Sequence, residues 1–202
     1  HGITGFSDRT RGVFSGGTTP TLLNTLQFVT MSSTGDTIDF GDTNTAQRNN
    51  SCFASPTRGV IYIAGYSNTI EFVTISTTGN STDFGDTLFT GQYGAGCSNS
   101  VRGLFMEGNS TPSTRSTAVE YVTISSLGNA QDLGDLTDDN YLLAATASST
   151  RAVRGGGSHA SSEANIIDYA QIMSTGNFVD FGDLTGEYAG QAGCSNGHGG
   201  LG

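Results

Sequence analysis

Apolar and polar residues follow one pattern through a block that occurs four times along the chain. The four copies occupy residues 26–42, 70–86, 119–135 and 167–183. In the second copy, Ile70 and Phe72 fall on one side of an extended segment and Val73 falls on the other. Apolar residues on both sides predict a strand in a sheet that is covered on both faces. The repetition itself predicts an architecture built from four equivalent units.

Each copy carries a glycine followed by an acidic or amide residue near its middle. These pairs are Gly35-Asp36, Gly79-Asn80, Gly128-Asn129 and Gly176-Asn177. A two-residue turn led by glycine supplies the positive φ that matches the twist of a hairpin. We therefore expect a tight β-hairpin inside every copy, whose returning strand ends in Asp-Phe-Gly-Asp or Asp-Leu-Gly-Asp.

An arginine recurs at one fixed spacing after each of the first three copies. These residues are Arg58, Arg102 and Arg151; glycine follows the first two, and Ala152 follows the third. The apolar run after each arginine predicts one strand, and the segment before it predicts another. Each unit thus contains four short strands. We name them A and B, before and after the arginine, and C and D, within the repeated block.

Four antiparallel strands per unit, apolar on both faces, are typical of a β-propeller blade, because each blade packs between two others. We therefore predict an all-β fold: one repeat domain over residues 1–202, a β-propeller of four four-stranded blades of about 48 residues each. The units span residues 3–48, 49–92, 93–140 and 141–188, followed by a surplus strand in 189–202. A β-solenoid is the alternative, since repetition and glycine also suit it.

The surplus strand raises a question of completeness. Residues 3–8 and 191–196 both look like strand A, which gives five A strands against four of each other kind. A closed ring of four blades needs only four. The surplus indicates an excerpt from a longer array, a larger ring completed elsewhere, or a terminal strand that completes a neighbouring subunit.

Composition narrows the range of partners. The net charge is −10, and the eight basic residues are all arginine. A phosphate backbone would be repelled, so we expect no nucleic-acid partner. No apolar run approaches the roughly 18 residues of a membrane-spanning helix, so we expect no membrane partner either.

The aspartates that end the four copies are the candidate metal ligands. They are Asp42, Asp86, Asp135 and Asp183. Oxygen-rich positions repeated around a ring could bind Ca²⁺, which takes six to eight oxygen ligands. Alternatively, each carboxylate accepts backbone N–H groups at the end of its strand. Apart from Ca²⁺ in the first interpretation, we expect no cofactor.

The three cysteines are Cys52, Cys97 and Cys194. Matching positions in separate repeats point the same way in space, so they do not approach the 4.4–6.8 Å Cα separation of a disulfide. We interpret them as small buried side chains. Residues 193–197 match the G-x-S-x-G pattern of a catalytic serine, but no helix is predicted to follow, so we assign no catalytic residue.

Loop residues supply the candidate ligand-binding site. Tyr93, Tyr141 and Tyr188 fall in D–A loops, and the B–C loops, whose lengths vary, carry Tyr66, Arg115 and His159. In a propeller these two kinds of loop open on the same face, and loops on a rigid scaffold usually carry binding. Tyrosine offers a ring and a hydroxyl for stacking on a sugar or anchoring a protein. Alternatively, the tyrosines cover the edges of the blades.

Two stretches resemble known repeat families. Arg11–Gly17 (R-G-V-F-S-G-G) resembles kelch-type propeller repeats, although the tryptophan of their strand D is absent. The phrase I-x-[FY]-V-T-I-S-x-x-G-N-x-x-D-F-G-D, followed by C-S-x-S-x-R-G-[VL]-F, resembles repeat arrays in tail-fibre or virion-associated proteins of aquatic bacteriophages. This likeness covers essentially the whole chain. It implies a structural or adhesive role in an extracellular or virion setting.

These observations favour a non-enzymatic structural and adhesive module of a phage fibre. It would bind a glycan or a cell-surface protein receptor as a homo-oligomer or as part of a larger assembly. The alternative is a subunit that only self-assembles into a filament or virion. A third hypothesis is a glycan-active enzyme, which needs two carboxylates roughly 5–9.5 Å apart in a pocket.

Overall fold

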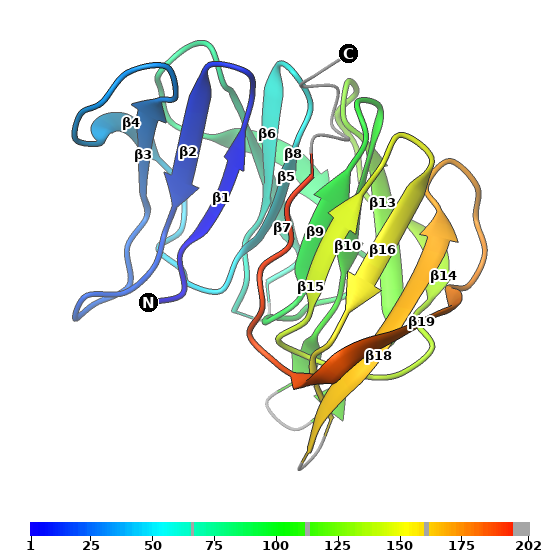
Figure 1. Ribbon diagram of the computed structural model, residues 1–202. Helices are drawn as coiled ribbons and strands as arrows, with labels where there is room; N and C mark the ends of the chain where they lie inside the picture. The colour runs from blue at the N-terminus through cyan, green and yellow to red at the C-terminus, as the bar shows by residue number, and fades with distance from the viewer. Residues whose placement is uncertain (66, 112–113, 160–161, 196–202) are drawn as a thin grey trace.

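The computed structural model describes residues 1–65, 67–111, 114–159 and 162–195, and every regular element among them is a strand. The strands form four antiparallel sheets that follow one another along the chain (Figure 1). The first contains β1 (Thr4–Ser7), β2 (Arg11–Ser15), β3 (Thr25–Thr30) and β4 (Ile38–Asp42). The second contains β5 (Ser51–Ala54), β6 (Arg58–Tyr62), β7 (Thr69–Thr74) and β8 (Thr82–Asp86).

The third and fourth sheets repeat this order with additions. The third contains β9 (Ala95–Ser98), β10 (Arg102–Met106), β13 (Ala118–Thr123) and β14 (Gln131–Asp135). A separate hairpin of β11 (Asn109–Thr111) and β12 (Thr114–Arg115) lies between β10 and β13 in the chain. The fourth contains β15 (Ala144–Ala147), β16 (Arg151–Gly155), β18 (Ser162–Gln171) and β19 (Val179–Tyr188), and β17 (Ser158–His159) pairs with the start of β18. Among the described residues, no helix is long and apolar enough to span a bilayer.

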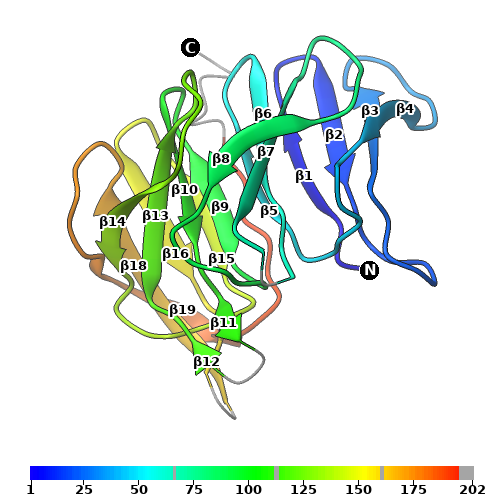
Figure 2. The ribbon, with the colours of Figure 1, turned by 180° about the vertical axis from the view of Figure 1, so that it is seen from behind.

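The first strands of the four sheets lie next to one another. The strand β5 contacts both β1 and β9, and β9 in turn contacts β15. Figure 2 shows the same succession of sheets from behind. The all-β class predicted from the sequence is confirmed, and the antiparallel order within each sheet is that of a meander.

The last strand of each sheet carries a β-bulge at its Asp-Phe-Gly-Asp or Asp-Leu-Gly-Asp segment. In the second sheet, Ile70 pairs with Gly85 and Glu71 pairs with Asp83, so Phe84 is an extra residue. The corresponding extra residues are Phe40, Leu133 and Phe181. The Phe84 side chain is 2% exposed and packs in a core cluster with residues of the third sheet. The bulge thus supplies an apolar contact between adjacent sheets.

The Gly-Asn pairs do not form the tight hairpins that the sequence predicted. The connection between β7 and β8 is the longer segment 75–81, which contains Gly79 at φ 153°. The Gly79 N–H donates to the Phe40 carbonyl (2.7 Å), and the Asp42 N–H donates to Oδ1 of Asn80 (3.1 Å). The same bonds recur at Gly128-Asn129 and Gly176-Asn177. The pair therefore joins two sheets rather than two strands of one sheet.

The repeated arginines make a second contact between sheets. Arg11, Arg58 and Arg102 donate from Nη1 to the carbonyls of Ile75, Ile124 and Ile172, at 2.8, 2.9 and 3.2 Å. Each guanidinium also lies over an aromatic ring of its own sheet, at 4.6, 4.8 and 3.8 Å from the ring centroid. A planar guanidinium stacks through its face while it donates from its edge, and an ammonium group does not. This dual contact explains why arginine fills the position.

A buried carboxylate makes a third contact. Glu71, Glu120 and Asp168 occupy equivalent places in sheets two to four and are 1%, 4% and 0% exposed. Each accepts a backbone N–H from the loop after the preceding sheet, donated by Asn44, Leu88 and Thr137 at 3.1, 2.9 and 3.0 Å. Burial raises the pKa of Glu120 to about 7, although backbone hydrogen bonds oppose the shift. We call the contact between two successive sheets a junction. It consists of the bulge side chain, the Gly-Asn hydrogen bonds, the arginine contact and the hydrogen bond to the buried carboxylate. The part of the chain that the structure describes contains three junctions.

The residue after each arginine is small because a side chain of the preceding sheet lies over it. A Cβ at Gly59 or Gly103 would lie 1.9 Å from the ring of Phe6 or Phe53, respectively. In the fourth sheet Ala152 takes the place of glycine, and the corresponding residue of the third sheet is the smaller Cys97, in the same core cluster. The departure from the Arg-Gly pattern therefore follows from the size of the residue that covers it.

This size matching gives a first prediction. Gly103→Ala should lower the free energy of unfolding by about 1–3 kcal/mol, because the added methyl group overpacks a filled site. Adding Phe53→Cys, which reproduces the Cys97–Ala152 combination, should recover part of that loss. The control is Gly12→Ala, whose added Cβ would meet only Val29 Cγ2 at 3.6 Å. Urea unfolding of the four proteins measures the effect, and an equal loss in the single and double variants would contradict it.

Candidate functional site

The D–A loops and B–C segments of the third and fourth sheets lie side by side. Isolated bridges pair Gln92 with Asn109 and Tyr141 with Ser158, and each bridge joins the two kinds of segment. Figure 2 shows the β11–β12 hairpin at the lower end of the molecule. In this part of the molecule the two kinds of loop share one face, as expected from the sequence.

Three of the predicted binding residues meet there. The rings of Tyr93 and Tyr141 are in edge-to-face contact with centroids 6.1 Å apart, and the Arg115 guanidinium lies 5.9 Å from the Tyr141 centroid. All three side chains are half-buried. The Nε of Arg115 is buried without a hydrogen-bond partner among the described residues. Two stacked rings and an unused donor are suited to a ligand that offers both an apolar surface and an acceptor.

The backbone under this cluster is strained. Asn49, Tyr93 and Leu142 have φ of 60°, 61° and 56°, in the left-handed region that bulky side chains rarely adopt. The three residues occupy the same place in successive loops, and the Leu142 N–H donates to the Tyr93 carbonyl at 2.9 Å. Strained positions of this kind concentrate at binding sites, where surrounding contacts hold them. No sequence pattern predicted this strain.

An acidic pair and a histidine extend the cluster. His159 Nε2 lies 2.9 Å from Oδ1 of Asp139, and both side chains are partly exposed. Ligand atoms of Asp138, Asp139 and His159 all lie within 4.8 Å of one another, which is close enough for a metal ion. The sequence predicted His159 but missed the two aspartates, because they stand outside the repeated block. We call the surface formed by Tyr93, Arg115, Asp139, Tyr141 and His159 the loop face.

Two other predicted binding residues fall elsewhere. Tyr188 was expected in a loop, but it is the last residue of β19, paired with Ala164, and its side chain is 47% exposed. The long fourth strand continues to Tyr188 because β18 is also extended and provides pairing partners. Tyr66 lies outside the described residues.

The four candidate metal ligands at the ends of the repeated blocks do not come together. Asp42, Asp86, Asp135 and Asp183 lie on β4, β8, β14 and β19, which belong to four different sheets. The backbone N–H groups of the first three donate to the asparagine side chains of the next sheet. Their repetition along the sequence reflects the junction, so the predicted ring of calcium ligands is not formed by these residues.

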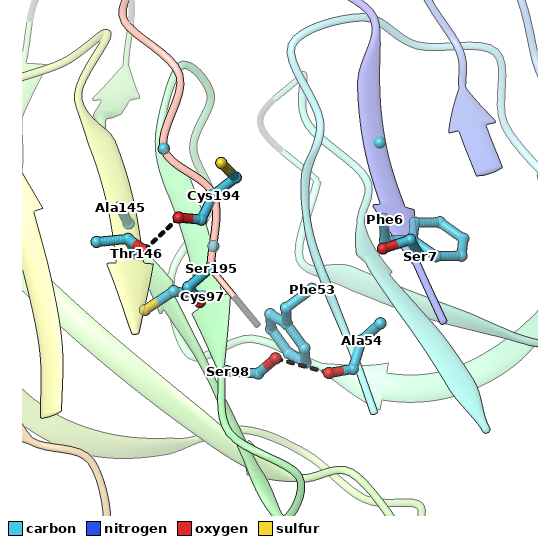
Figure 3. Close-up of a pocket in the computed structure, with 13 residues that line it drawn as sticks. Phe6, Ser7, Phe53, Ala54, Cys97, Ser98, Ala145, Thr146, Cys194 and Ser195 are labelled. Carbon is cyan, nitrogen blue, oxygen red and sulfur yellow. Dashed lines mark hydrogen bonds between the residues drawn. The ribbon is translucent and has the colours of Figure 1, made fainter. Parts of the chain in front are cut away.

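A cavity of about 140 Å³ lies between the first strands of the sheets. It is lined by residues of β1, β5, β9 and β15 and by residues 193–195 (Figure 3). Thr146 donates from Oγ1 to the Cys194 carbonyl at 2.9 Å, and a Cβ at Gly193 would lie 2.4 Å from the Ala145 carbonyl oxygen. Residues 191–195 therefore lie beside β15 as β9 lies beside β5. The described lining of this cavity contains no carboxylate.

The cysteines partly follow the expectation of small buried side chains. Cys52 and Cys97 are free and buried, and burial raises the pKa of their thiols to about 11 and about 12. Cys194 is exposed, contrary to the prediction; it lies in the surplus segment, which belongs to none of the described sheets. High thiol pKa values make the two buried cysteines poor nucleophiles.

One pair of carboxylates lines a second, buried cavity. Glu107 and Glu120 line a cavity together with Tyr62, and burial raises the pKa of Glu107 as well as that of Glu120. The cavity measures about 10 Å³, which is the space of one water molecule. A sugar ring does not fit between these two carboxylates.

Comparison with known proteins gives a structural likeness only. No family model matches the sequence, and no curated protein matches it. A solved structure described as "Structure of YjhT" superimposes with a TM-score of 0.78 and 11% sequence identity. The alignment covers 96% of this chain and 73% of that chain. At this identity the likeness supports the arrangement of strands and carries no information about activity.

Proposed function

We propose that this protein is a non-enzymatic adhesive module with a β-propeller architecture. The four sheets are its blades, and the loop face holds a glycan or a protein receptor. Support for the architecture comes from four meandering sheets whose first strands lie next to one another and line one cavity. The resemblance of the repeats to phage arrays supports an extracellular or virion setting, as part of a fibre.

One observation carries the binding proposal. Tyr93, whose φ is 61°, forms an edge-to-face pair with Tyr141, and Arg115 lies over the Tyr141 ring. A rigid aromatic pair needs little ordering on binding, so its contact area contributes efficiently to affinity. Arg115, Asp139 and His159 add hydrogen-bond donors and an acceptor that match the hydroxyl groups of a sugar or the polar rim of a protein.

The proposal predicts a large effect of Tyr141→Ala on binding. The ligand is a glycan identified by screening the full chain on a glycan array. We expect its affinity to fall at least about tenfold, because the ring lies at the centre of the loop face. Tyr141→Phe should retain most of the affinity if stacking dominates. Isothermal titration calorimetry measures both.

Tyr121→Ala is the matched control for this experiment. Tyr121 also lies under an arginine, at 3.8 Å, but it belongs to β13 and not to the loop face. Unfolding curves verify that each variant is folded. A ligand whose affinity is unchanged by Tyr141→Ala and Arg115→Ala would contradict the assignment of the loop face.

A second candidate function, self-assembly as a structural subunit, is supported by a different set of residues. Large apolar side chains are exposed on the outer faces of the first and fourth sheets, among them Met31 at 51% and Phe181 at 54%. These residues lie away from the loop face, so adhesion and assembly are compatible.

A further inference from the structure

The fourth sheet presents one half of a junction. Phe181 occupies the bulge position at which Phe40, Phe84 and Leu133 are 2%, 2% and 1% exposed, yet Phe181 itself is 54% exposed. A Cβ at Gly182 would have no atom within 4 Å, whereas one at the equivalent Gly85 would lie 2.5 Å from the Gly128 carbonyl oxygen. Arg151 is exposed and lies over the Tyr169 ring in the same way as the junction arginines. The side of the fourth sheet that carries Phe181 therefore matches the side that each of the first three sheets presents to the sheet after it.

The first sheet presents the other half. Met31 is 51% exposed, whereas the equivalent Ile75, Ile124 and Ile172 are 0%, 1% and 0% exposed. Phe14 is 44% exposed, whereas the equivalent Ile61 and Phe105 are 0% and 4% exposed. Gly35-Asp36 stands where the Gly-Asn pairs of the other three copies stand. The side chain of Asp36 can accept a backbone N–H as Asn80 does.

We propose that these two faces bind each other between copies of the chain, head to tail. The face of the fourth sheet with Phe181 receives the Met31, Phe14 and Gly35-Asp36 face of the first sheet of a second copy. The three junctions inside the chain show how such faces fit. They bury the bulge side chain, satisfy the backbone of the Gly-Asn pair and supply a carbonyl to the arginine. Because the two faces are different, the contact is heterologous and adds copies in a ring or a filament.

Residues 191–195 mark the place where the incoming copy belongs. They lie beside β15, where β1 of the second copy would lie in a fourth junction. Unlike β1, which pairs with β2 over four residues, they belong to none of the described sheets. In the proposed contact β1 of the second copy replaces them. A substitution that detaches this segment should therefore strengthen association.

Sedimentation velocity of the full chain over a range of concentrations tests the proposal. The wild type should associate with increasing concentration, and Phe181→Asp or Phe14→Asp alone should raise the dissociation constant at least about tenfold. An equimolar mixture of the two variants should form a dimer, because each retains one intact face. Val101→Asp, at a 47% exposed apolar residue in the β9–β10 turn, should behave like the wild type.

Each other outcome overturns part of the proposal. A wild type that stays monomeric throughout, or a mixture of the two variants that remains monomeric, rules out the head-to-tail contact. If Val101→Asp weakens association as much as Phe181→Asp and Phe14→Asp do, the effect of those two variants is not specific to the proposed faces. Gly193→Val, whose side chain would collide with the Ala145 carbonyl, should tighten association. Weaker association in that variant would show instead that residues 191–195 complete the neighbouring subunit.

Discussion

Arg154→Met is expected to lower the free energy of unfolding by about 3–5 kcal/mol, because it leaves a buried carboxylate without its cation. Arg154 and Asp168 are each 0% exposed, with Nε 2.8 Å from Oδ1 and Nη2 2.9 Å from Oδ2. Methionine fills similar volume, so the loss is chiefly electrostatic. Urea unfolding at neutral pH measures it.

The neighbouring sheets supply the control. The residues equivalent to Arg154 are Ile61 and Phe105, which accompany Glu71 and Glu120. The double variant Arg154→Phe with Asp168→Glu therefore reproduces the pairing of the third sheet. It should unfold at a higher urea concentration than Arg154→Phe alone, since the longer carboxylate can take its hydrogen bonds from the preceding loop. A loss below about 1 kcal/mol in Arg154→Met would contradict the assigned role of the pair.

The strands were predicted well from the sequence, because a strand that is buried on both faces carries apolar residues on both of its sides over a few consecutive positions. The alternation from Ile70 to Ile75 is set by the two sheets that cover β7, and the repeat multiplies this signal. The Gly-Asn pair misled the prediction for a physical reason. A glycine with positive φ suits a hairpin, and it equally suits a backbone that must approach another sheet closely. Spacing along one chain does not distinguish these two uses.

The candidate site was predictable only in part. Tyr93 and Tyr141 were found because their spacing relates them to the repeat, and the packing of adjacent loops brings their rings together. Asp139 could not be found in this way, because its partner His159 is brought near by the bridge between Tyr141 and Ser158. Contacts between segments of variable length depend on the fold and do not appear as a repeated residue spacing in the sequence.

Gly85→Ala is expected to lower the free energy of unfolding by about 2–6 kcal/mol, as the sum of two effects. Gly85 has φ of 146°, in a region that is essentially restricted to glycine and costs other residues about 1–3 kcal/mol. The added Cβ would also lie 2.5 Å from the Gly128 carbonyl oxygen of the next sheet, which is backbone and cannot rotate away. Overpacking of this kind adds about 1–3 kcal/mol. Thermal and urea unfolding of the variant measure the total.

Gly182→Ala separates the two effects. Gly182 has φ of 137° at the equivalent place in the fourth sheet, but no atom lies within 4 Å of an added Cβ. It therefore carries the backbone strain without the collision, and should cost about 1–3 kcal/mol less than Gly85→Ala. If both variants lose the same stability, the glycine is required for its φ alone. A smaller loss in Gly182→Ala means that close approach between sheets also selects glycine, and that the repeated Asp-Phe-Gly-Asp segment is a signature of sheet stacking.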